Sequence, residues 1–234
     1  MAIKLVTFDL DNTLWDNDPV LQRAEQACYQ YLQQQSPQLA SVYSAADLAQ
    51  LRLQLISQSP QLAAQVSKLR KLAMQQALQA VAHPAAQIPA LVEQAFAVFY
   101  RERNRIELFP HARPLLDQLK PYYQLGTLTN GNSDLQLVGI SEYFAFTLSA
   151  EKVGAAKPRP NLFHGALHRG NVLPHEMVHI GDHPEDDVYG AQQLGIHSIW
   201  FNPGKKRWSE LSSKKAPTAT VHCLSEIIDV LKRF

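Results

Sequence analysis

Three short apolar segments of this sequence each end in a cluster of polar residues. The clusters are Asp9–Thr13 after Leu5–Phe8, Thr129–Gly131 after Leu125–Leu128, and Gly181-Asp182 after Val178–Ile180. Apolar runs of this length are typical of buried strands. Ligands of an open parallel sheet bind at the carboxyl ends of its strands. The three clusters therefore predict a parallel sheet with one shared site where these strands end.

The first cluster carries two carboxylates, Asp9 and Asp11, directly after an apolar run. A turn would crowd them into one site near Lys4, and a divalent cation such as Mg²⁺ would relieve their repulsion. Asp9 could then attack a phosphoryl group and form an aspartyl-phosphate. Asp11 could protonate the leaving oxygen and later activate water. Taken alone, these residues slightly favour the alternative, a strand followed by an Asx turn.

Two further segments carry groups that suit a phosphate. The Thr129 hydroxyl and nearby backbone N–H groups can hold phosphate oxygens, and Gly131 permits close approach of the backbone. Lys157, which precedes Pro158, could screen the charge of a carboxylate nucleophile and of a phosphate. The alternatives are a helix N-cap formed by Thr129 or Asn130, and an ordinary solvated loop lysine.

The third cluster is acidic: Asp182, Glu185, Asp186 and Asp187 fall within six residues. Such a concentration of carboxylates at a strand end is costly without a cation. The alternative is the acidic start of a helix, which the helix dipole favours. His183, inside this loop, could equally contact a phosphate or cap the turn.

These segments, in this order, resemble the haloacid dehalogenase superfamily of phosphohydrolases along essentially the whole chain. The resemblance implies that Asp9 is the nucleophile and a Mg²⁺ ligand. It implies that Asp11 is the general acid/base and that its backbone carbonyl also binds the metal. Phosphate binding by Thr129 and Asn130, helped by Lys157, is implied as well.

The resemblance also implies that Asp182 ligates Mg²⁺, directly or through water, and that a further acid orients the metal shell. Family members carry this acid four or five residues after the aspartate of Gly-Asp, and this chain has Asp186 and Asp187 at both places. The stretch Gly-Asp-His-Pro-Glu-x-Asp resembles the five-residue variety, which favours Asp187.

Glycine and glutamine divide the chain into two parts. All ten glycines lie at or after Gly126, whereas 17 glutamines lie between Gln22 and Gln94. Glutamine, alanine and leucine favour helix, and glycine marks the turns of an α/β region. Four helices are predicted: 19–35, one from Ser44 with an Asp47 capping box, one after Ser59-Pro60, and one after His83-Pro84 that ends near Arg103.

The second half alternates strands with helices. Strands are predicted at 123–128, 146–148, 178–181, 198–201 and 220–223, and helices at 112–119, 161–169, 188–194 and 225–233. This alternation predicts an α/β fold, a doubly wound parallel sheet with a Rossmann-like core. In the resemblance, the helical block is an inserted α-helical cap over 17–105, and 1–16 with 106–234 form the catalytic core. Hinges are predicted near 16–17 and 105–110.

Composition restricts the possible partners. A net charge of +1 implies no general affinity for polyanions, so no nucleic-acid partner is expected. Cys28 and Cys223 do not suggest a disulfide framework, and a cytoplasmic location is the natural interpretation. The first strand begins at once, which leaves no room for a signal peptide, and no apolar stretch approaches membrane-spanning length. A monomer or homodimer without a membrane partner is expected.

Within the superfamily, the chain resembles bacterial capped phosphatases that act on flavin mononucleotide and on a phosphorylated ribitylaminopyrimidine. The similar stretches are 7–17, 19–20, 103–106 and 129–132. The predicted function is hydrolysis of small phosphorylated metabolites through an aspartyl-phosphate, with Mg²⁺. Trp15, beside the first cluster, is expected to pack at the cap junction rather than stack on a planar substrate.

Three alternative functions use similar residues. A haloacid dehalogenase would attack carbon with Asp9, but it would need neither Asp11 nor a metal. A phosphotransferase would pass the same phosphoryl group to another hydroxyl. A receiver-type signalling module would accept one phosphate without turnover, and both Asp11 and the helical block argue against it.

Overall fold

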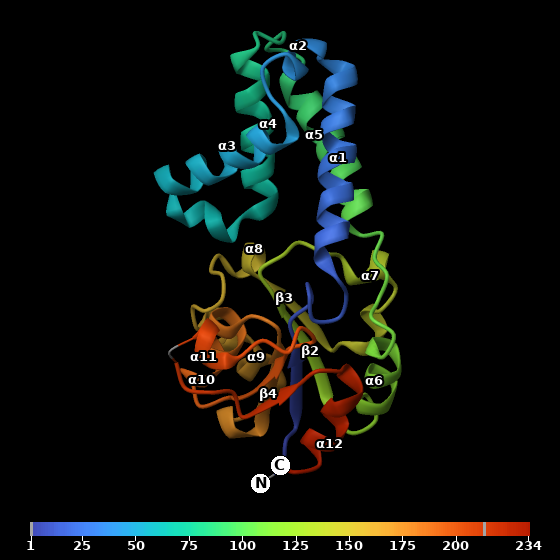
Figure 1. Cartoon of the computed structure of the whole chain (residues 1–234), viewed down its shortest axis with the longest axis vertical. Helices are drawn as coiled ribbons and strands as arrows, with labels where there is room; N and C mark the ends of the chain where they lie inside the picture. Colours follow the sequence, from blue (N-terminus) through green and yellow to red (C-terminus); the bar gives the residue numbers. More distant parts are fainter. Residues whose placement is uncertain (1, 213) are drawn as a thin grey trace. The chain divides into compact units, whose positions relative to one another are not determined.

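A six-stranded sheet in the order β3-β2-β1-β4-β5-β6 runs through the α/β part of this computed structural model, which describes residues 2–212 and 214–234 (Figure 1). Every pairing in the sheet is parallel. The strands are β1 (Leu5–Phe8), β2 (Gln124–Thr129), β3 (Phe146–Ser149), β4 (Met177–Gly181), β5 (His197–Phe201) and β6 (Ala219–Val221). The order confirms the predicted doubly wound α/β fold, because the chain extends from β1 first to one side and then to the other.

Burial explains why the central strands read as apolar runs. All residues of β1 and β4 are buried, as expected for parallel strands that are covered on both faces. Leu5, Leu128 and Met177 share one apolar cluster with Phe163 of helix α9 (Asn161–Gly170). The helices of this unit are α6 (Ala112–Leu119), η2 (Ser141–Tyr143), α8 (Ala150–Val153), α9 (Asn161–Gly170), η3 (Pro174–Glu176), η4 (Pro184–Tyr189), α10 (Gly190–Gln192), α11 (Trp208–Leu211), η5 (Leu224–Glu226) and α12 (Ile227–Leu231).

The predicted helix 188–194 differs from the structure. A π-helical turn, η4, begins four residues earlier at Pro184, and α10 continues only to Gln192. The earlier start has a local cause, because the His183 side chain accepts the backbone N–H of Asp186 at 3.1 Å and caps the turn. This capping role is one of the two that the sequence allowed for His183, and π-turns are frequent at functional sites.

The chain forms two compact units. The α/β unit contains the chain up to Asp16, Glu107–Gly131 and the chain from Gly139, and the helical unit contains Asn17–Ile106 and Asn132–Val138. The sequence assigned Asn132–Val138, which includes α7 (Leu135–Val138), to the core, but these residues cluster with the helices. The Asn132 side chain donates to the Ser67 hydroxyl at 3.0 Å, and the backbone N–H of Asp134 donates to Asn104 Oδ1 at 2.7 Å.

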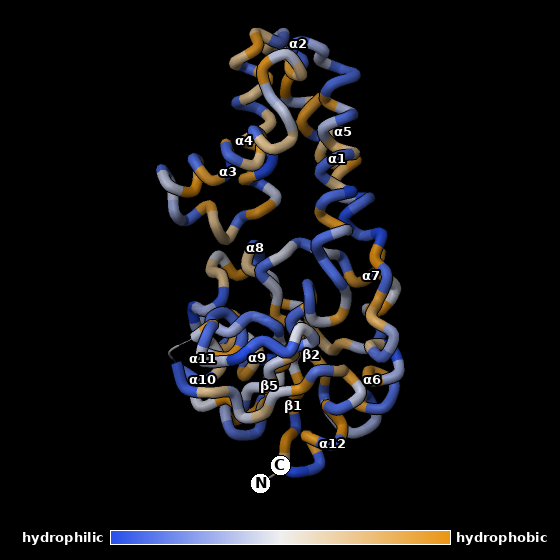
Figure 2. The backbone as a smooth tube through the Cα atoms, viewed as in Figure 1, coloured by the Kyte–Doolittle hydropathy of each residue, from blue (hydrophilic) through white to orange (hydrophobic). Residues whose placement is uncertain are grey.

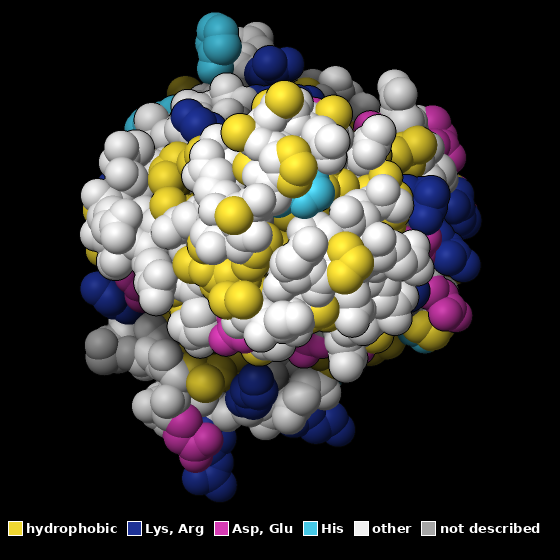
Figure 3. All heavy atoms as spheres, turned by 90° about the horizontal axis from the view of Figure 1, so that it is seen from above, with side chains coloured by type: hydrophobic (Ala, Val, Ile, Leu, Met, Phe, Trp, Pro, Cys, Tyr) yellow, Lys and Arg dark blue, Asp and Glu magenta, His cyan; other side chains and the backbone are white. Residues whose placement is uncertain are grey.

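The helical unit buries an apolar core. Hydrophilic and hydrophobic residues alternate along its helices (Figure 2). Its helices are α1 (Asn17–Gln35), α2 (Pro37–Ala40), α3 (Ala45–Gln58), η1 (Pro60–Ala64), α4 (Val66–Ala80) and α5 (Ile88–Arg103), with α1 packed along α5. In Figure 3, the face turned toward the viewer shows few charged side chains, and apolar side chains lie among the backbone and the remaining side chains. Glutamine-rich sequence therefore forms helix surface here, since apolar residues still recur on the inner faces.

The structure agrees with one predicted helix start and differs from another. The Ser44 capping box is confirmed, because the Ser44 hydroxyl accepts the Asp47 N–H and the Asp47 carboxylate accepts the Ser44 N–H. Ser59 makes no side-chain cap, and Pro60 begins only a 3₁₀ turn before α4 starts at Val66. Across the described residues, no helix combines the length and apolar character needed to cross a bilayer.

Candidate active site

The sheet order places β2, β1 and β4 next to each other, so their carboxyl ends meet at one edge. Thr129 ends β2, Asp9 follows β1, and Asp182 follows β4. The backbone N–H of Asp9 donates to the carbonyl of Ile180 at 2.8 Å, which extends the pairing of β1 with β4 by one residue. Backbone hydrogen bonds thus fix where the Asp9 side chain leaves the sheet.

A pocket of about 170 Å³ lies at this edge. Its lining includes every site residue predicted from the sequence: Asp9, Asp11, Thr129, Asn130, Lys157, Asp182 and Asp187. Asn12, Gly131, His183 and Asp186 line it as well. The four sequence segments thus come together as the strand-end argument predicts, although their individual roles remain predictions.

Lys157 lies at the centre of the charged groups and is buried. Its ammonium donates to Asp9 Oδ1 at 2.7 Å, to Asp187 Oδ1 at 2.6 Å and to the carbonyl of Leu128 at 2.7 Å. Burial alone would lower the pKa of Lys157, but the Asp187 and Asp9 carboxylates raise it above its ordinary value. Lys157 is therefore a fixed positive charge, and the alternative of a solvated loop lysine is wrong.

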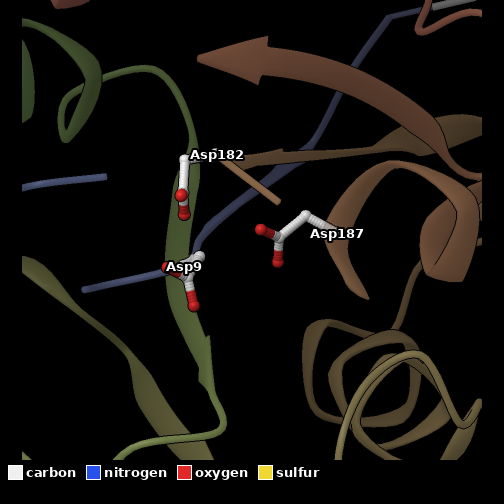
Figure 4. Close-up of side chains that lie close together, drawn as sticks. All are labelled: Asp9, Asp182 and Asp187. Carbon is white, nitrogen blue, oxygen red and sulfur yellow. The ribbon is translucent and has the colours of Figure 1, made fainter. Parts of the chain in front are cut away.

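Three carboxylates converge beside this lysine. One oxygen from each of Asp9, Asp182 and Asp187 lies within 4.8 Å of the others, and the three carboxylates point toward a common space (Figure 4). Burial raises the pKa of Asp9 well above its ordinary value despite the opposing effect of Lys157. Burial, followed by the charge of Asp187, raises the pKa of Asp182 to about 6. With all three carboxylates ionised, the site would hold more negative charge than Lys157 balances.

This donor set fits a hard divalent cation. Buried carboxylates with raised pKa values show that neutral forms are favoured where no further positive charge is present. Oxygen ligands at this spacing are those that Mg²⁺ or Ca²⁺ prefers. Asp9, Asp182 and Asp187 could hold such an ion, which would stabilise their ionised forms.

Asp187, rather than Asp186, belongs to this group. Its Oδ1 accepts Lys157 and contacts His179 Nε2 at 3.1 Å, and its Oδ2 accepts the backbone N–H of His183 at 2.9 Å. Burial alone would raise the pKa of Asp187, but Lys157 and the hydrogen bond with His179 hold it well below its ordinary value. Asp186 lies nearer solvent and accepts a hydrogen bond from Asn130.

Gly181 makes room for Asp187. A Cβ atom at Gly181 would overlap the Asp187 carboxylate, including its Cγ and Oδ2 atoms. The glycine of the Gly-Asp pair is thus needed for space rather than for an unusual backbone conformation.

The loop after β2 carries a hydroxyl at the pocket. Thr129 Oγ1 accepts the backbone N–H of Gly131 at 2.9 Å, so its own proton can be donated elsewhere. The Asn130 side chain instead binds the backbone of Lys157. Its Oδ1 accepts the backbone N–H of Lys157 at 2.8 Å, and its Nδ2 donates to the backbone carbonyl of Lys157 and to the Asp186 carboxylate. Asn130 therefore orders the lysine loop with its side chain.

The turn after Asp9 presents two further contacts. The Thr13 hydroxyl lies 3.2 Å from Asp9 Oδ2 and 3.4 Å from Asp182 Oδ1. Asp11 Oδ1 accepts the indole N–H of Trp15 at 2.9 Å, and Trp15 is fully buried. The expected packing role of Trp15 fits this burial, but its hydrogen bond to Asp11 was not predicted.

His179 is a site residue that sequence reasoning missed. It is buried in β4, where its Nδ1 lies 2.9 Å from the Thr7 hydroxyl and its Nε2 contacts Asp187. Thr7 and His179 are directly paired in the sheet register, and the His179 and Phe163 rings form a T-shaped contact. Its one sequence signal is an imidazole two residues before Gly181 in an apolar strand, since a buried polar ring needs partners.

Known proteins resemble this chain in sequence and in structure. The profile of haloacid dehalogenase-like hydrolases matches residues 3–195. The chain belongs to this family. The ribitylaminouracil phosphatase YigB of Escherichia coli K12, in full 5-amino-6-(5-phospho-D-ribitylamino)uracil phosphatase, is 33% identical over 201 residues, which cover 86% of this chain and 84% of that protein.

Two other similar proteins have different descriptions. Phosphoserine phosphatase of Thermus thermophilus is 35% identical over 122 residues, which cover 50% of this chain and 49% of that protein. A crystal structure described as a 2-haloacid dehalogenase from Pseudomonas syringae pv. Tomato DC3000 is 39% identical, with a TM-score of 0.93 over 99% of both chains. The protein is thus an enzyme of this hydrolase family, and the relatives that are named as phosphatases support phosphatase activity.

Proposed function

We propose that this protein is a Mg²⁺-dependent phosphomonoester hydrolase of small phosphorylated metabolites. The observation that carries the proposal is the convergence of Asp9, Asp182 and Asp187 beside Lys157, in a pocket that Asp11 also lines. A carboxylate nucleophile, a second carboxylate for proton transfer and a site for a hard cation are the groups that this reaction needs.

In the first step, a carboxylate oxygen of Asp9 attacks phosphorus, and the bond between phosphorus and the leaving oxygen breaks. Asp11 gives its proton to that oxygen, so an alcohol leaves and Asp9 carries the phosphoryl group. The Thr129 hydroxyl donates to a phosphoryl oxygen. The three Lys157 N–H groups already have protein acceptors, so Lys157 acts on the phosphoryl group through its charge.

In the second step, water attacks the phosphorus of the aspartyl-phosphate. Asp11, now ionised, takes a proton from this water, and the bond between phosphorus and the Asp9 oxygen breaks. Inorganic phosphate leaves, and both carboxyl groups return to their starting forms.

Asp9, Asp182 and the Asp11 carbonyl would hold Mg²⁺, with Asp187 orienting this set. The ion would supply positive charge to the phosphoryl oxygens. Because burial disfavours ionised Asp9 and Asp182, loss of the ion is expected to reduce the fraction of ionised nucleophile.

For the substrate, we propose phosphorylated metabolites that include a ribitylaminopyrimidine phosphate or flavin mononucleotide. The relation to the Escherichia coli protein named as a phosphatase of ribitylaminouracil phosphate supports this choice. We further propose action as a monomer or homodimer in the cytoplasm, without nucleic-acid or membrane partners. The free thiols of Cys28 and Cys223 suit a reducing compartment.

A haloacid dehalogenase is the second candidate, because the Pseudomonas syringae protein described by that name is similar along its whole length. In that reaction Asp9 would attack carbon and expel a halide. Neither Asp11 nor a cation would be required, so that reaction leaves Asp11 and the arrangement of Asp9, Asp182 and Asp187 around a common space without an explanation. The phosphatase therefore explains more of the pocket.

The test is phosphate release from a panel of phosphorylated metabolites, with Mg²⁺ and with EDTA. We expect Mg²⁺-dependent turnover for the natural protein and none above background for Asp9→Asn, because the amide is a poor nucleophile. Asp229→Asn, an exposed substitution in α12, is the matched control and should keep full activity.

Other outcomes would point elsewhere. Halide release from a 2-haloacid in EDTA would support the dehalogenase. Phosphoryl transfer to an added alcohol instead of water would support a phosphotransferase, and one phosphate bound per chain without turnover would support a receiver-type module. Near-normal phosphate release by Asp9→Asn would contradict the assignment of the nucleophile.

A further inference from the structure

The only polar group of the Trp15 side chain is directed at Asp11. The indole Nε1 donates to Asp11 Oδ1 at 2.9 Å, and Trp15 is one of the largest fully buried side chains among the described residues. Indole has one N–H and no acceptor, so its hydrogen-bonding capacity is used on this carboxylate. An apolar ring would fill the same space without this contact.

The backbone holds Trp15 on two sides. Trp15 forms isolated β-bridges with Asp11 and with Leu108, and the Phe109 N–H donates to the Leu14 carbonyl at 2.9 Å. These contacts all lie within the α/β unit. The indole donor therefore projects from a segment that is fixed at both the Asp11 turn and the chain near Leu108.

Asp11 itself differs from the other pocket carboxylates. Within the described residues, the group whose oxygens lie within 4.8 Å of one another contains Asp9, Asp182 and Asp187. The side chain of Asp11 is outside that group, although it lines the same pocket. Its carboxylate can thus serve a task other than metal ligation, and its direction depends on what holds it.

We propose that Trp15 is a positioning residue that orients Asp11 for proton transfer. The proposal rests on the phosphatase function proposed above. Because the Trp15 indole donates to Oδ1, it restricts rotation of the carboxyl group and favours the transferred proton on Oδ2. Proton transfer between heavy atoms needs such a fixed geometry, and small misplacements are costly.

The test compares leaving groups in Trp15→Phe, which removes the N–H and keeps an aromatic ring. An alkyl phosphate needs its leaving oxygen protonated, whereas p-nitrophenolate leaves from p-nitrophenyl phosphate without help. We expect kcat/KM, which reports formation of the aspartyl-phosphate, to fall by roughly tenfold or more for the alkyl phosphate, because the variant loses a hydrogen bond to the carboxylate charge that develops as Asp11 gives up its proton. We expect only a minor change for p-nitrophenyl phosphate.

A purely structural role gives a different result. General damage to the pocket would lower kcat/KM for both substrates by the same factor, and that outcome would overturn the proposal. Trp208→Phe is the matched control, because the Trp208 indole donates to the Lys214 carbonyl instead. It should leave both values unchanged.

A double-mutant comparison tests the same link through Asp11. With phenyl phosphate, whose leaving group is intermediate, Trp15→Phe should lower kcat/KM in the natural protein but not in Asp11→Ala. Equal losses in both backgrounds would show that Trp15 acts independently of Asp11.

One measurement needs neither turnover nor a Trp15 variant. In an NMR spectrum of indole N–H groups, Asp11→Ala should shift the Trp15 resonance and leave that of Trp208 in place. An unmoved Trp15 resonance would overturn the proposal even if phosphate release is normal. Conversely, absence of phosphate release by the natural protein would remove the proposed function, whatever this resonance does.

Discussion

Each unit of the molecule contains a cluster of three charged side chains that joins acids and bases. In one cluster the acids outnumber the base, and in the other the bases outnumber the acid. In the α/β unit, Lys157 lies between Asp9 and Asp187. In the helical unit, Glu25 Oε1 accepts both Arg52, at 2.6 Å, and Arg70, at 3.1 Å. With every group ionised, the first cluster has one surplus negative charge and the second has one surplus positive charge.

The two clusters differ in burial, and this difference decides how well each tolerates its net charge. The Lys157 and Asp187 side chains are each 2% exposed, whereas those of Glu25, Arg52 and Arg70 are 13–29% exposed. Burial lowers the pKa of Arg70 only to about 10, so it stays charged at neutral pH. The helical cluster, which joins α1, α3 and α4, therefore tolerates its positive surplus at a partly solvated junction of three helices. The strand-end cluster is more deeply buried, and its carboxylates form a donor set that fits a further cation.

The largest expected effect comes from removing the central charge of the buried cluster. Lys157→Met leaves the Asp9 and Asp187 carboxylates facing each other, and breaking a buried ion pair costs about 3–5 kcal/mol. Urea unfolding at pH 7 would measure this loss. Lys152→Met, in the exposed part of α8, is the control and should change little. A loss for Lys157→Met as small as the control's would contradict the central role of this charge.

A smaller effect is expected from pH in the absence of a metal. Burial raises the pKa of Asp182 from 3.8 to about 6, so protonated Asp182 favours the folded state. This contribution is fully present below pH 3.8 and is lost as pH rises through about 6. In EDTA, the free energy of unfolding should therefore fall by roughly 2 kcal/mol across this range from Asp182 alone.

Three other carboxylates also contribute to the pH dependence of the free energy of unfolding. Burial also raises the pKa values of Asp9 and Asp186, so they add to the fall, whereas Asp187 loses its stabilising contribution only toward more acidic pH. Asp182→Asn should flatten the profile, and Mg²⁺ should do the same in the natural protein. A profile that is as steep in Asp182→Asn as in the natural protein would contradict the assignment.

The smallest effect is expected in the helical cluster. Glu25→Gln leaves Arg52 and Arg70 together but partly solvated, so we expect a loss of about 1 kcal/mol. Phosphate release should not change. A stability loss equal to that of Lys157→Met would remove the distinction between the two clusters.

The parts that could be predicted from the sequence are those encoded locally. Apolar runs and the polar residues directly after them predict the strands and their site-bearing ends, because parallel strands end at one edge. The Ser44 capping box is similarly local, with its two partners three residues apart.

The remaining features depend on contacts between distant residues. The pairing of Thr7 with His179 spans 172 positions, and the buried Lys157 reaches Asp9 across 148. The association of Asn132–Val138 with the helical unit likewise follows from tertiary packing, since Asn132 contacts Ser67 and Asp134 contacts Asn104. The partners of a residue within the sheet are set by the register of the folded strands, and the local periodicity of the sequence does not contain this register.

Gly181 has a consequence for which substitutions the chain tolerates. Gly139 and Gly154 have positive φ values and open space around them, so asparagine is a natural replacement there. At Gly181 even alanine would collide with the Asp187 carboxylate. In a saturation library selected for activity, the first two positions should accept a narrow set of residues, and position 181 should return glycine alone.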